Sequence, residues 1–325
     1  MSRGAVTPPP PHPGPCGRWV AALRLPTLMA SATSILSGAA ATLQLDRRRG
    51  GGSPEIIDWG WLFVTFAGLA VLQIAANLIN DYGDFKKGAD GKDRLGPPRV
   101  ISMGWIKPSE IRRAIDITLY FELIFAIPLC VRGGFGVLIL GIIGVIGAIW
   151  YTSGTRSLAY LGLGEVAVFL LFGPGAVLGT VLVQTKGEML VSVFQSTLVP
   201  ALIAGSFVSA ILVVNNLRDI PTDLKAGKAT LATRLGTMWT RRMYVVMILL
   251  PYLLTAKLSS LQKKCYLGIG WRFSLLTLPI GCVAMWQVST RSGRSLNSSL
   301  GLTAALGTAF SATATFALYA QGRSD

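Results

Sequence analysis

Apolar runs of about 20 residues, the length that spans the hydrocarbon core of a bilayer, recur along most of this chain. Hydrophobic residues make up 51% of the 325 residues and charged residues only 14%, whereas an ordinary soluble domain has about 25% charged residues. A water-soluble chain would need polar surface at every loop, and too little is present here. The sequence therefore predicts an integral membrane protein.

We predict about nine membrane spans, because that many runs reach the required length. They are expected at 26–45, 59–80, 114–131, 133–152, 158–183, 190–214, 243–260, 270–289 and 298–320. No ten-residue stretches alternate between apolar and polar residues, as the strands of a membrane barrel would, so each span is expected to be a helix. The predicted fold class is all-α, a polytopic helical bundle.

The chain carries a formal net charge of +15, and its basic residues flank the predicted spans. Such flanking charge favours the cytoplasmic side, which predicts a cytoplasmic N-terminus and an external C-terminus. The same explanation makes nucleic acid an unexpected partner. The chain has a single histidine, His12, and this argues against chemistry based on histidine triads or histidine-rich metal sites.

Three regions are expected along the chain. Residues 1–25 form a proline-rich cytoplasmic lead-in, in which the prolines between Pro8 and Pro15 predict a stiff segment without regular structure. Residues 26–320 form one transmembrane domain, and 321–325 are a short tail. Two polar segments within the domain, 81–113 and 217–242, are expected to face the cytoplasm together.

Six of the 15 acidic residues are aspartates in these two polar segments. The six are Asp81, Asp84, Asp90, Asp93, Asp219 and Asp223. Carboxylates three or four residues apart lie on one face of a continuing helix, and like charges near a membrane interior need a neutralising cation. Mg²⁺ suits one or two carboxylates completed by water and phosphate oxygens. The pattern therefore indicates a magnesium site.

Lysine and arginine residues lie among these acids in both segments. Acids alone would bind a metal, but the mixture favours a metal together with an anion. A diphosphate ester needs this combination, because the metal bridges its oxygens while basic side chains neutralise the remaining charge. Two other interpretations stay open here: ordinary solvated loops, or a transporter or isoprenoid-binding protein in which the acids couple an ion.

The two motifs resemble the two Asp-rich motifs of the UbiA superfamily of intramembrane prenyltransferases. The first comprises residues 80–90 (NDYGDFKKGAD), then 92–94 (KDR) and Gly96-Pro97, and the second comprises 215–219 (NNLRD), 227–231 (GKATL) and 234–236 (RLG). The stretch from Tyr151 to Glu165 is similar to the segment that follows the fourth helix of the family. Gly88 stands where the wider superfamily usually has a third Asp, a departure that the branch acting on 1,4-dihydroxy-2-naphthoate shares.

The resemblance implies roles for individual residues. Asn80 and Asp84 would hold one Mg²⁺ and Asp219 and Asp223 a second. Asp81 and Asp90 would support the site or transfer a proton, and Tyr151, ahead of Tyr82 and Tyr160, would face an allylic cation. The residues expected to bind the departing diphosphate are Lys92, Arg94, Arg156, Arg218 and Lys228. Glu165 is expected either in the site or in helix pairing, because a lipid-facing carboxylate would be costly.

The reaction that the resemblance implies is Mg²⁺-dependent transfer of a polyprenyl or phytyl group from its diphosphate to 1,4-dihydroxy-2-naphthoate. CO₂ and diphosphate would be lost, giving a demethylmenaquinone or demethylphylloquinone. Transfer to another aromatic acceptor, 4-hydroxybenzoate or homogentisate, is the alternative. The short, proline-rich lead-in does not suit a transit peptide, so a bacterial inner membrane is favoured over a plastid membrane.

Overall fold

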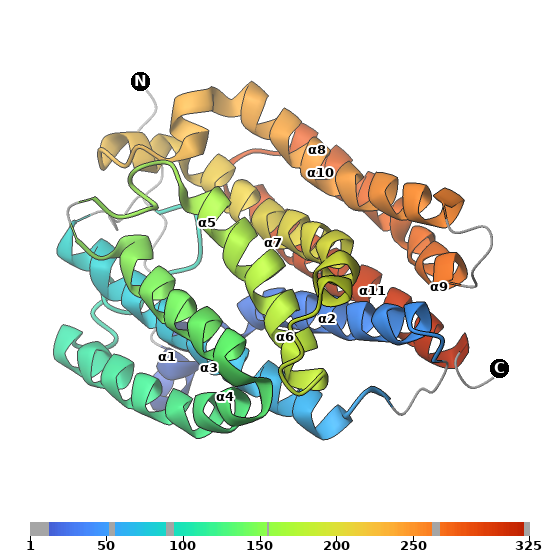
Figure 1. Ribbon diagram of the computed structural model, residues 1–325. Helices are drawn as coiled ribbons and strands as arrows, with labels where there is room; N and C mark the ends of the chain where they lie inside the picture. Colours follow the sequence, from blue (N-terminus) through green and yellow to red (C-terminus); the bar gives the residue numbers. More distant parts are fainter. Residues whose placement is uncertain (1–12, 52–55, 89–93, 155, 262–266, 322–325) are drawn as a thin grey trace.

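The computed structural model describes residues 13–51, 56–88, 94–154, 156–261 and 267–321, and in these residues the regular structure is helical throughout. The helices are α1 (Gly14–Leu23), α2 (Leu28–Arg48), α3 (Trp59–Lys86), α4 (Pro108–Thr152), α5 (Gly164–Leu170), α6 (Ala176–Gln184), α7 (Val191–Lys225), α8 (Leu231–Leu261), α9 (Leu267–Phe273), α10 (Leu278–Thr290) and α11 (Leu296–Gln321). Figure 1 shows them packed as one bundle. The all-α prediction is confirmed.

Seven helices within the described residues are long and apolar enough to cross a membrane. The predicted spans fall largely on helices, but residues 158–163 of the fifth span form turns before α5. Two of the spans, 114–131 and 133–152, share α4, and the span 243–260 lies on α8, which is not among the seven. The count of nine and the orientation in the membrane therefore stay predictions.

Helix α4 is a hairpin of two halves. Its helical path is broken at Gly134, whose φ of 69° and ψ of −162° are open to glycine but not to most residues. Gly68 of α3 packs against Leu129 in the first half, whereas Gly144 in the second half packs against Leu72. The two halves thus run in opposite directions along α3, and both have one end beside the end of α3 at Lys86 (Figure 1).

The expectation of an irregular lead-in is wrong for residues 14–23, which form α1. Pro15 lies in its first turn, where a missing N–H costs nothing because that group has no partner within the helix. Ala22 is fully buried in a cluster with Leu78 and Ile106, and Arg18 donates to the Trp105 carbonyl at 3.0 Å. Tertiary packing onto α3 and the loop before α4 therefore fixes this helix.

The core surrounds α7, which packs against α2, α8 and α11. Phe207 of α7 lies 5.1 Å, between ring centroids, from Phe310 of α11, and Tyr252 of α8 lies 5.3 Å from the same ring. Between α5 and α6 a π-helical turn, Leu171–Gly175, brings the chain very close to α7. A Cβ added at Gly205 would lie 2.9 Å from the Phe169 carbonyl oxygen.

Both polar segments are more helical than expected. Helix α3 continues to Lys86 and α7 to Lys225, so Asp81, Asp84, Asp219 and Asp223 lie in the last turns of two long helices. Helix α8 begins at Leu231, which leaves only a short connection, 226–230, in the second segment. The acids are thereby held on helical backbone at one end of the bundle.

Substituting Gly205→Ala should destabilise the protein, because the new methyl group meets backbone that cannot move aside. Overpacking of this kind costs about 1–3 kcal/mol. Gly141→Ala is the matched control, since an added Cβ there meets nothing within 4 Å. Thermal unfolding in detergent should give a lower midpoint for Gly205→Ala only, and equal midpoints would contradict the close approach of α5 and α7.

Candidate active site

The first motif occupies the end of α3, and its two aspartates are almost fully buried. Asp81 and Asp84 are each 2% exposed. The Asp81 carboxylate is ion-paired with both Arg24 and Arg99. Arg99 also lies 3.3 Å from Asp84 Oδ2, between its Nη2 and that oxygen. One guanidinium from the loop before α4 thus joins the two aspartates.

Arg24 reaches Asp81 from the connection between α1 and α2. Its backbone is left-handed, with φ 52°, a conformation that non-glycine residues rarely adopt and that recurs at functional sites. Asn77 of α3 holds this connection by donating to Thr27 Oγ1 at 2.9 Å. The N-terminal part of the chain therefore supplies a charge to the first motif.

Asp84 is the point at which distant segments meet. The Tyr160 hydroxyl, from the segment after α4, donates to Asp84 Oδ1 at 3.2 Å. Lys228 Nζ, from the connection after α7, lies 3.8 Å from Asp84 Oδ2 and 5.3 Å from the centroid of the Tyr160 ring. The predicted residues Asp84 and Lys228 are thus brought together, and with them the two halves of the chain.

Asn80 is held by the end of α4. Thr152 Oγ1 donates to Asn80 Oδ1 at 2.9 Å, and Lys87 Nζ donates to the Thr152 carbonyl at 2.7 Å and to Ser157 Oγ at 2.9 Å. Partial desolvation of the Lys87 ammonium lowers its pKa, the Lys228 charge lowers it further, and Asp84 opposes both. Lys87 Nζ also lies 3.9 Å from the centroid of the Tyr160 ring. Lys87 therefore contacts both Tyr160 and Thr152, the residue that hydrogen-bonds to Asn80.

The second motif centres on a buried fork between Arg218 and Asp219. Arg218 is 2% exposed and donates to the two Asp219 oxygens at 2.7 and 2.6 Å, the two-bond geometry that planar guanidinium groups favour. It also donates to Asn215 Oδ1 at 2.6 Å and to Asn297 Oδ1 at 2.7 Å. Asn297, at the start of α11, in turn donates to the Leu95 carbonyl at 3.2 Å, which holds the last part of the first motif against the second.

Gly96 allows that loop to approach. A Cβ added at Gly96 would lie 2.5 to 3.2 Å from the guanidinium atoms of Arg218. Only a residue without a side chain leaves this space. The glycine of the first motif therefore has a direct contact with the arginine of the second.

Glu165, in the first turn of α5, belongs to this end of the bundle. It is 2% exposed, and its Oε1 accepts from Asn216 Nδ2 at 2.9 Å. Within the described residues, Glu165 Oε2 and Asp223 Oδ2 are buried without a hydrogen-bond partner. Buried oxygens of this kind are costly unless a proton donor or cation satisfies them.

The three tyrosines lie in different places. The Tyr151 hydroxyl lies beside Gly164, 3.2 Å from where a Cβ there would be. Tyr160 contacts Asp84 directly. Tyr82 lies instead in a groove between α3 and α4, so the structure places it on another face of α3.

The remaining predicted residues are Arg94, Arg156, Asp90 and Lys92. Arg94 Nε donates to the Pro97 carbonyl at 2.9 Å. Arg156 is exposed, its carbonyl accepts from Trp150 Nε1 at 3.0 Å, and no ion pair joins its side chain to either motif in the described part of the chain. Asp90 and Lys92 lie outside the described residues.

Sequence reasoning missed Arg24 and Asn297, and it did not single out Arg99 as a partner of both aspartates. Arg24 and Asn297 lie in or beside other helices, far along the chain from either motif. The only local signal was the position of Arg24 just before the first apolar run. Hydrophobic patterning cannot reveal which distant side chain meets a carboxylate.

The donor set fits a magnesium ion. Within the described residues no three of the His, Cys, Asp and Glu side chains cluster closely enough to hold a metal alone, and Mg²⁺ needs only one or two carboxylates when phosphate and water complete its shell. Asp84 and Asp223 repel one another, and the unpartnered Asp223 oxygen is available for a cation. Every candidate donor is a hard oxygen, as Mg²⁺ requires.

An apolar helical bundle with carboxylates and guanidinium groups buried at one end is the arrangement of an integral membrane protein with a charged site at that end. The chain matches the profile of the UbiA prenyltransferase family over residues 51–306 and belongs to that family.

Curated relatives agree with this assignment. The chain is 36% identical over 268 residues, 81% of its length and 82% of the relative's, to the 1,4-dihydroxy-2-naphthoate octaprenyltransferase of Escherichia coli. It is 32% identical over 280 residues, 86% and 89% of the two lengths, to the enzyme of the same name from Mycobacterium tuberculosis. A UbiA homolog from Archaeoglobus fulgidus bound to DMAPP and Mg²⁺ shares the fold, with a TM-score of 0.61, 14% identity, and 94% and 99% of the two chains covered.

Replacing Arg218 with Met should destabilise the protein strongly, because the Asp219 carboxylate would stay buried without its partner. Removing one partner of a buried ion pair lowers the free energy of unfolding by about 3–5 kcal/mol. Arg49→Met is the control, since Arg49 and Glu188 form an exposed pair at 2.6 Å, worth about 1 kcal/mol or less. The midpoint of thermal unfolding in detergent, measured for each variant, gives the two losses of stability.

The double variant Arg218→Met/Asp219→Asn should recover part of the lost stability, because the uncompensated charge is then removed. If Arg218→Met and Arg49→Met lowered the midpoint equally, the buried fork would not contribute as described.

Proposed function

We propose that this protein is a Mg²⁺-dependent prenyltransferase that moves a polyprenyl or phytyl group from its diphosphate to 1,4-dihydroxy-2-naphthoate. CO₂ and diphosphate leave, and the product is a demethylmenaquinone or demethylphylloquinone. The observation that carries the proposal is the meeting of both motifs at Asp84, where carboxylate, Lys228 and Tyr160 converge at the end of an apolar bundle. Binding a diphosphate together with a metal needs carboxylates and basic side chains in one place. Binding the isoprenoid chain needs an apolar interior.

The acceptor is proposed from the relatives. The Escherichia coli and Mycobacterium tuberculosis relatives are named for 1,4-dihydroxy-2-naphthoate, and this chain spans most of their length. The bacterial relatives also support a bacterial inner membrane as the location. Acceptor choice depends on a few pocket residues, so 4-hydroxybenzoate is the informative rival in an assay.

Asn80, Asp84, Asp219 and Asp223 would hold Mg²⁺. The Archaeoglobus fulgidus homolog bound to DMAPP and Mg²⁺ supports this requirement. When bound, the metal supplies Lewis-acid stabilisation of the negative charge that develops on the leaving diphosphate.

Basic side chains of the chain would bind the diphosphate and hold it after the bond breaks. Lys228 is the best placed, because it lies between Asp84 and Tyr160. Arg94 and Lys92 belong to the first motif, and Arg156 is exposed in the segment after α4. As the allylic C–O bond breaks, its electron pair stays on the diphosphate oxygen. These cations would stabilise the negative charge that develops there.

Arg218, which the family resemblance places among the diphosphate ligands, instead has a positioning role in this proposal, as has Asp81. Arg218 holds both Asp219 oxygens and thereby fixes the orientation of that carboxylate. Asp81 holds Arg24 and Arg99, which close the site from two other segments. Asp90 remains the candidate for proton transfer in the first motif.

Tyr151 and Tyr160 would face the allylic cation. An aromatic ring attracts a cation over its face, and the Tyr160 ring already has Lys87 Nζ 3.9 Å from its centroid. Water has to be excluded, because it would quench the cation before the naphthoate ring carbon attacks. The packing of Tyr151 against Gly164 contributes to that exclusion.

The variants Asp84→Asn and Asp219→Asn should each reduce turnover at least about a hundredfold, the scale of losing one preorganised charged group. Asn keeps the shape of the side chain but removes its charge. Asp116→Asn is the matched control, since Asp116 lies outside both motifs and is half-exposed. Turnover is measured with purified, folded protein in membranes, and wild-type activity in either motif variant would remove that residue from the metal assignment.

A membrane assay with Mg²⁺, 1,4-dihydroxy-2-naphthoate and geranylgeranyl diphosphate should yield a prenylated, decarboxylated naphthoquinol, followed by mass. EDTA should abolish it, and added Mg²⁺ should restore it. If 4-hydroxybenzoate alone were prenylated, the acceptor would be wrong and the reaction class right. Absence of product with every acceptor and chain length would contradict the enzymatic proposal.

A further inference from the structure

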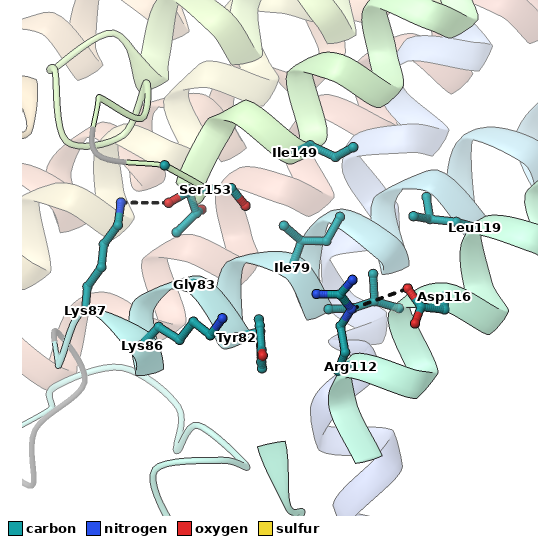
Figure 2. Close-up of a pocket in the computed structure, with 13 residues that line it drawn as sticks. Ile79, Tyr82, Gly83, Lys86, Lys87, Arg112, Asp116, Leu119, Ile149 and Ser153 are labelled. Carbon is teal, nitrogen blue, oxygen red and sulfur yellow. Dashed lines mark hydrogen bonds and ion pairs between the residues drawn. The ribbon is translucent and has the colours of Figure 1, made fainter. Parts of the chain in front are cut away.

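A groove of about 360 Å³ lies between α3 and the two halves of α4, at the same end of the bundle as the two motifs. Figure 2 shows side chains from all three helical segments turned towards it. Ile79 and Tyr82 come from α3, Ile115 and Leu119 from the first half of α4, and Ile149 from the second half. No step of the proposed reaction uses these residues.

The groove has an apolar part and a cationic part. Ile79, Ile115, Leu119 and Ile149 form the apolar part, away from the helix ends. Lys86 and Arg112 line the other part, near the end of α3 and the start of α4 (Figure 2). This division along one groove matches an amphiphile that has a hydrocarbon portion and an anionic portion.

The two cations are accessible. Lys86 Nζ lies 4.7 Å from the centroid of the Tyr82 ring, which holds the side chain over the groove. Arg112 Nε lies 3.5 Å from Asp116 Oδ1, with the Arg112 side chain 61% exposed. Asp116 is the one carboxylate that lines the described groove, whereas three basic residues line it, Lys86, Lys87 and Arg112, so the groove is positive overall.

The groove is separate from the candidate active site although both use α3. Asp81 and Asp84 turn towards Arg99, whereas Tyr82 and Lys86 line the groove. Thr152 and Lys87 form the shared wall: both line the groove, Thr152 donates its hydroxyl to Asn80, and Lys87 donates to the Thr152 carbonyl. A ligand in the groove would therefore lie behind the first motif.

We propose that this groove binds the phosphate-bearing head group of an anionic phospholipid. Basic pockets between membrane helices near the membrane surface suit such head groups, because the charges lie where the lipid phosphate lies. Ile149 is 42% exposed and Ile146, one turn earlier, is 55% exposed, so the apolar part continues onto the outer surface of α4. The acyl chains would lie along that surface.

Charge complementarity and shape favour this occupant over the prenyl diphosphate. A diphosphate with its metal needs several hard oxygen donors, and the groove offers one carboxylate, already paired with Arg112. A free phosphate would leave the apolar part unused. A phospholipid uses both parts of the groove.

Native mass spectrometry of the delipidated full-length protein tests the proposal. Phosphatidylglycerol should bind more tightly than phosphatidylcholine with the same acyl chains. The double variant Lys86→Gln/Arg112→Gln should weaken phosphatidylglycerol binding roughly tenfold or more, from the loss of two interfacial charges. Arg113→Gln is the matched control, because Arg113 is exposed on the same turn but does not line the groove.

Ile149→Trp tests the apolar part with both cations intact. The indole would fill the mouth of the groove, and phosphatidylglycerol binding should fall although the charge is unchanged. The proposal is overturned if the wild type does not discriminate between the two lipids, if the double variant binds as the wild type does, or if Arg113→Gln loses as much. Displacement of the lipid by inorganic phosphate or by geranylgeranyl diphosphate would assign the groove to that ligand instead.

Discussion

Burying negative charge at the end of an apolar bundle is the constraint on which the rest of this structure depends. Asp81 and Asp84 are almost fully enclosed, and an isolated charge in such a place would cost several kcal/mol. Each is compensated by side chains from other segments: Arg24 from before α2, Arg99 from before α4, and Lys228 from after α7. These segments have to pack at one end because the carboxylates require their charges there.

The close packing of α5 against α7 serves the same end of the bundle. Gly205 and the π-helical turn Leu171–Gly175 let the two backbones approach, which sets the first turn of α5 beside α7. Ser209 then donates to the Glu165 carbonyl at 3.1 Å and Asn216 donates to the Glu165 side chain. A packing feature in the middle of the bundle thus determines where a buried carboxylate meets the second motif.

Much of the architecture could be predicted from the sequence, because hydropathy is a local signal and a bilayer forces apolar runs into helices. The predicted spans fall largely on helices, and Asp81, Asp84, Asp219 and Asp223 lie near helix ends as expected. Helix α1 could not be predicted, since it depends on packing onto residues such as Ile106. Asn297 shows the same limit at the site: it joins Leu95 to Arg218, and no pattern near residue 297 reveals either partner.

Thr152 connects the chemistry to the membrane-facing surface. Its hydroxyl orients Asn80, its carbonyl accepts from Lys87, and its methyl group lies against Gly83, where an added Cβ would come within 2.8 Å. The same residue lines the groove between α3 and α4. Because close-packed contacts of this kind transmit displacement rather than absorb it, a change in the groove that moves Thr152 must also move the amide oxygen of Asn80. The groove and the first motif therefore share the Thr152 side chain.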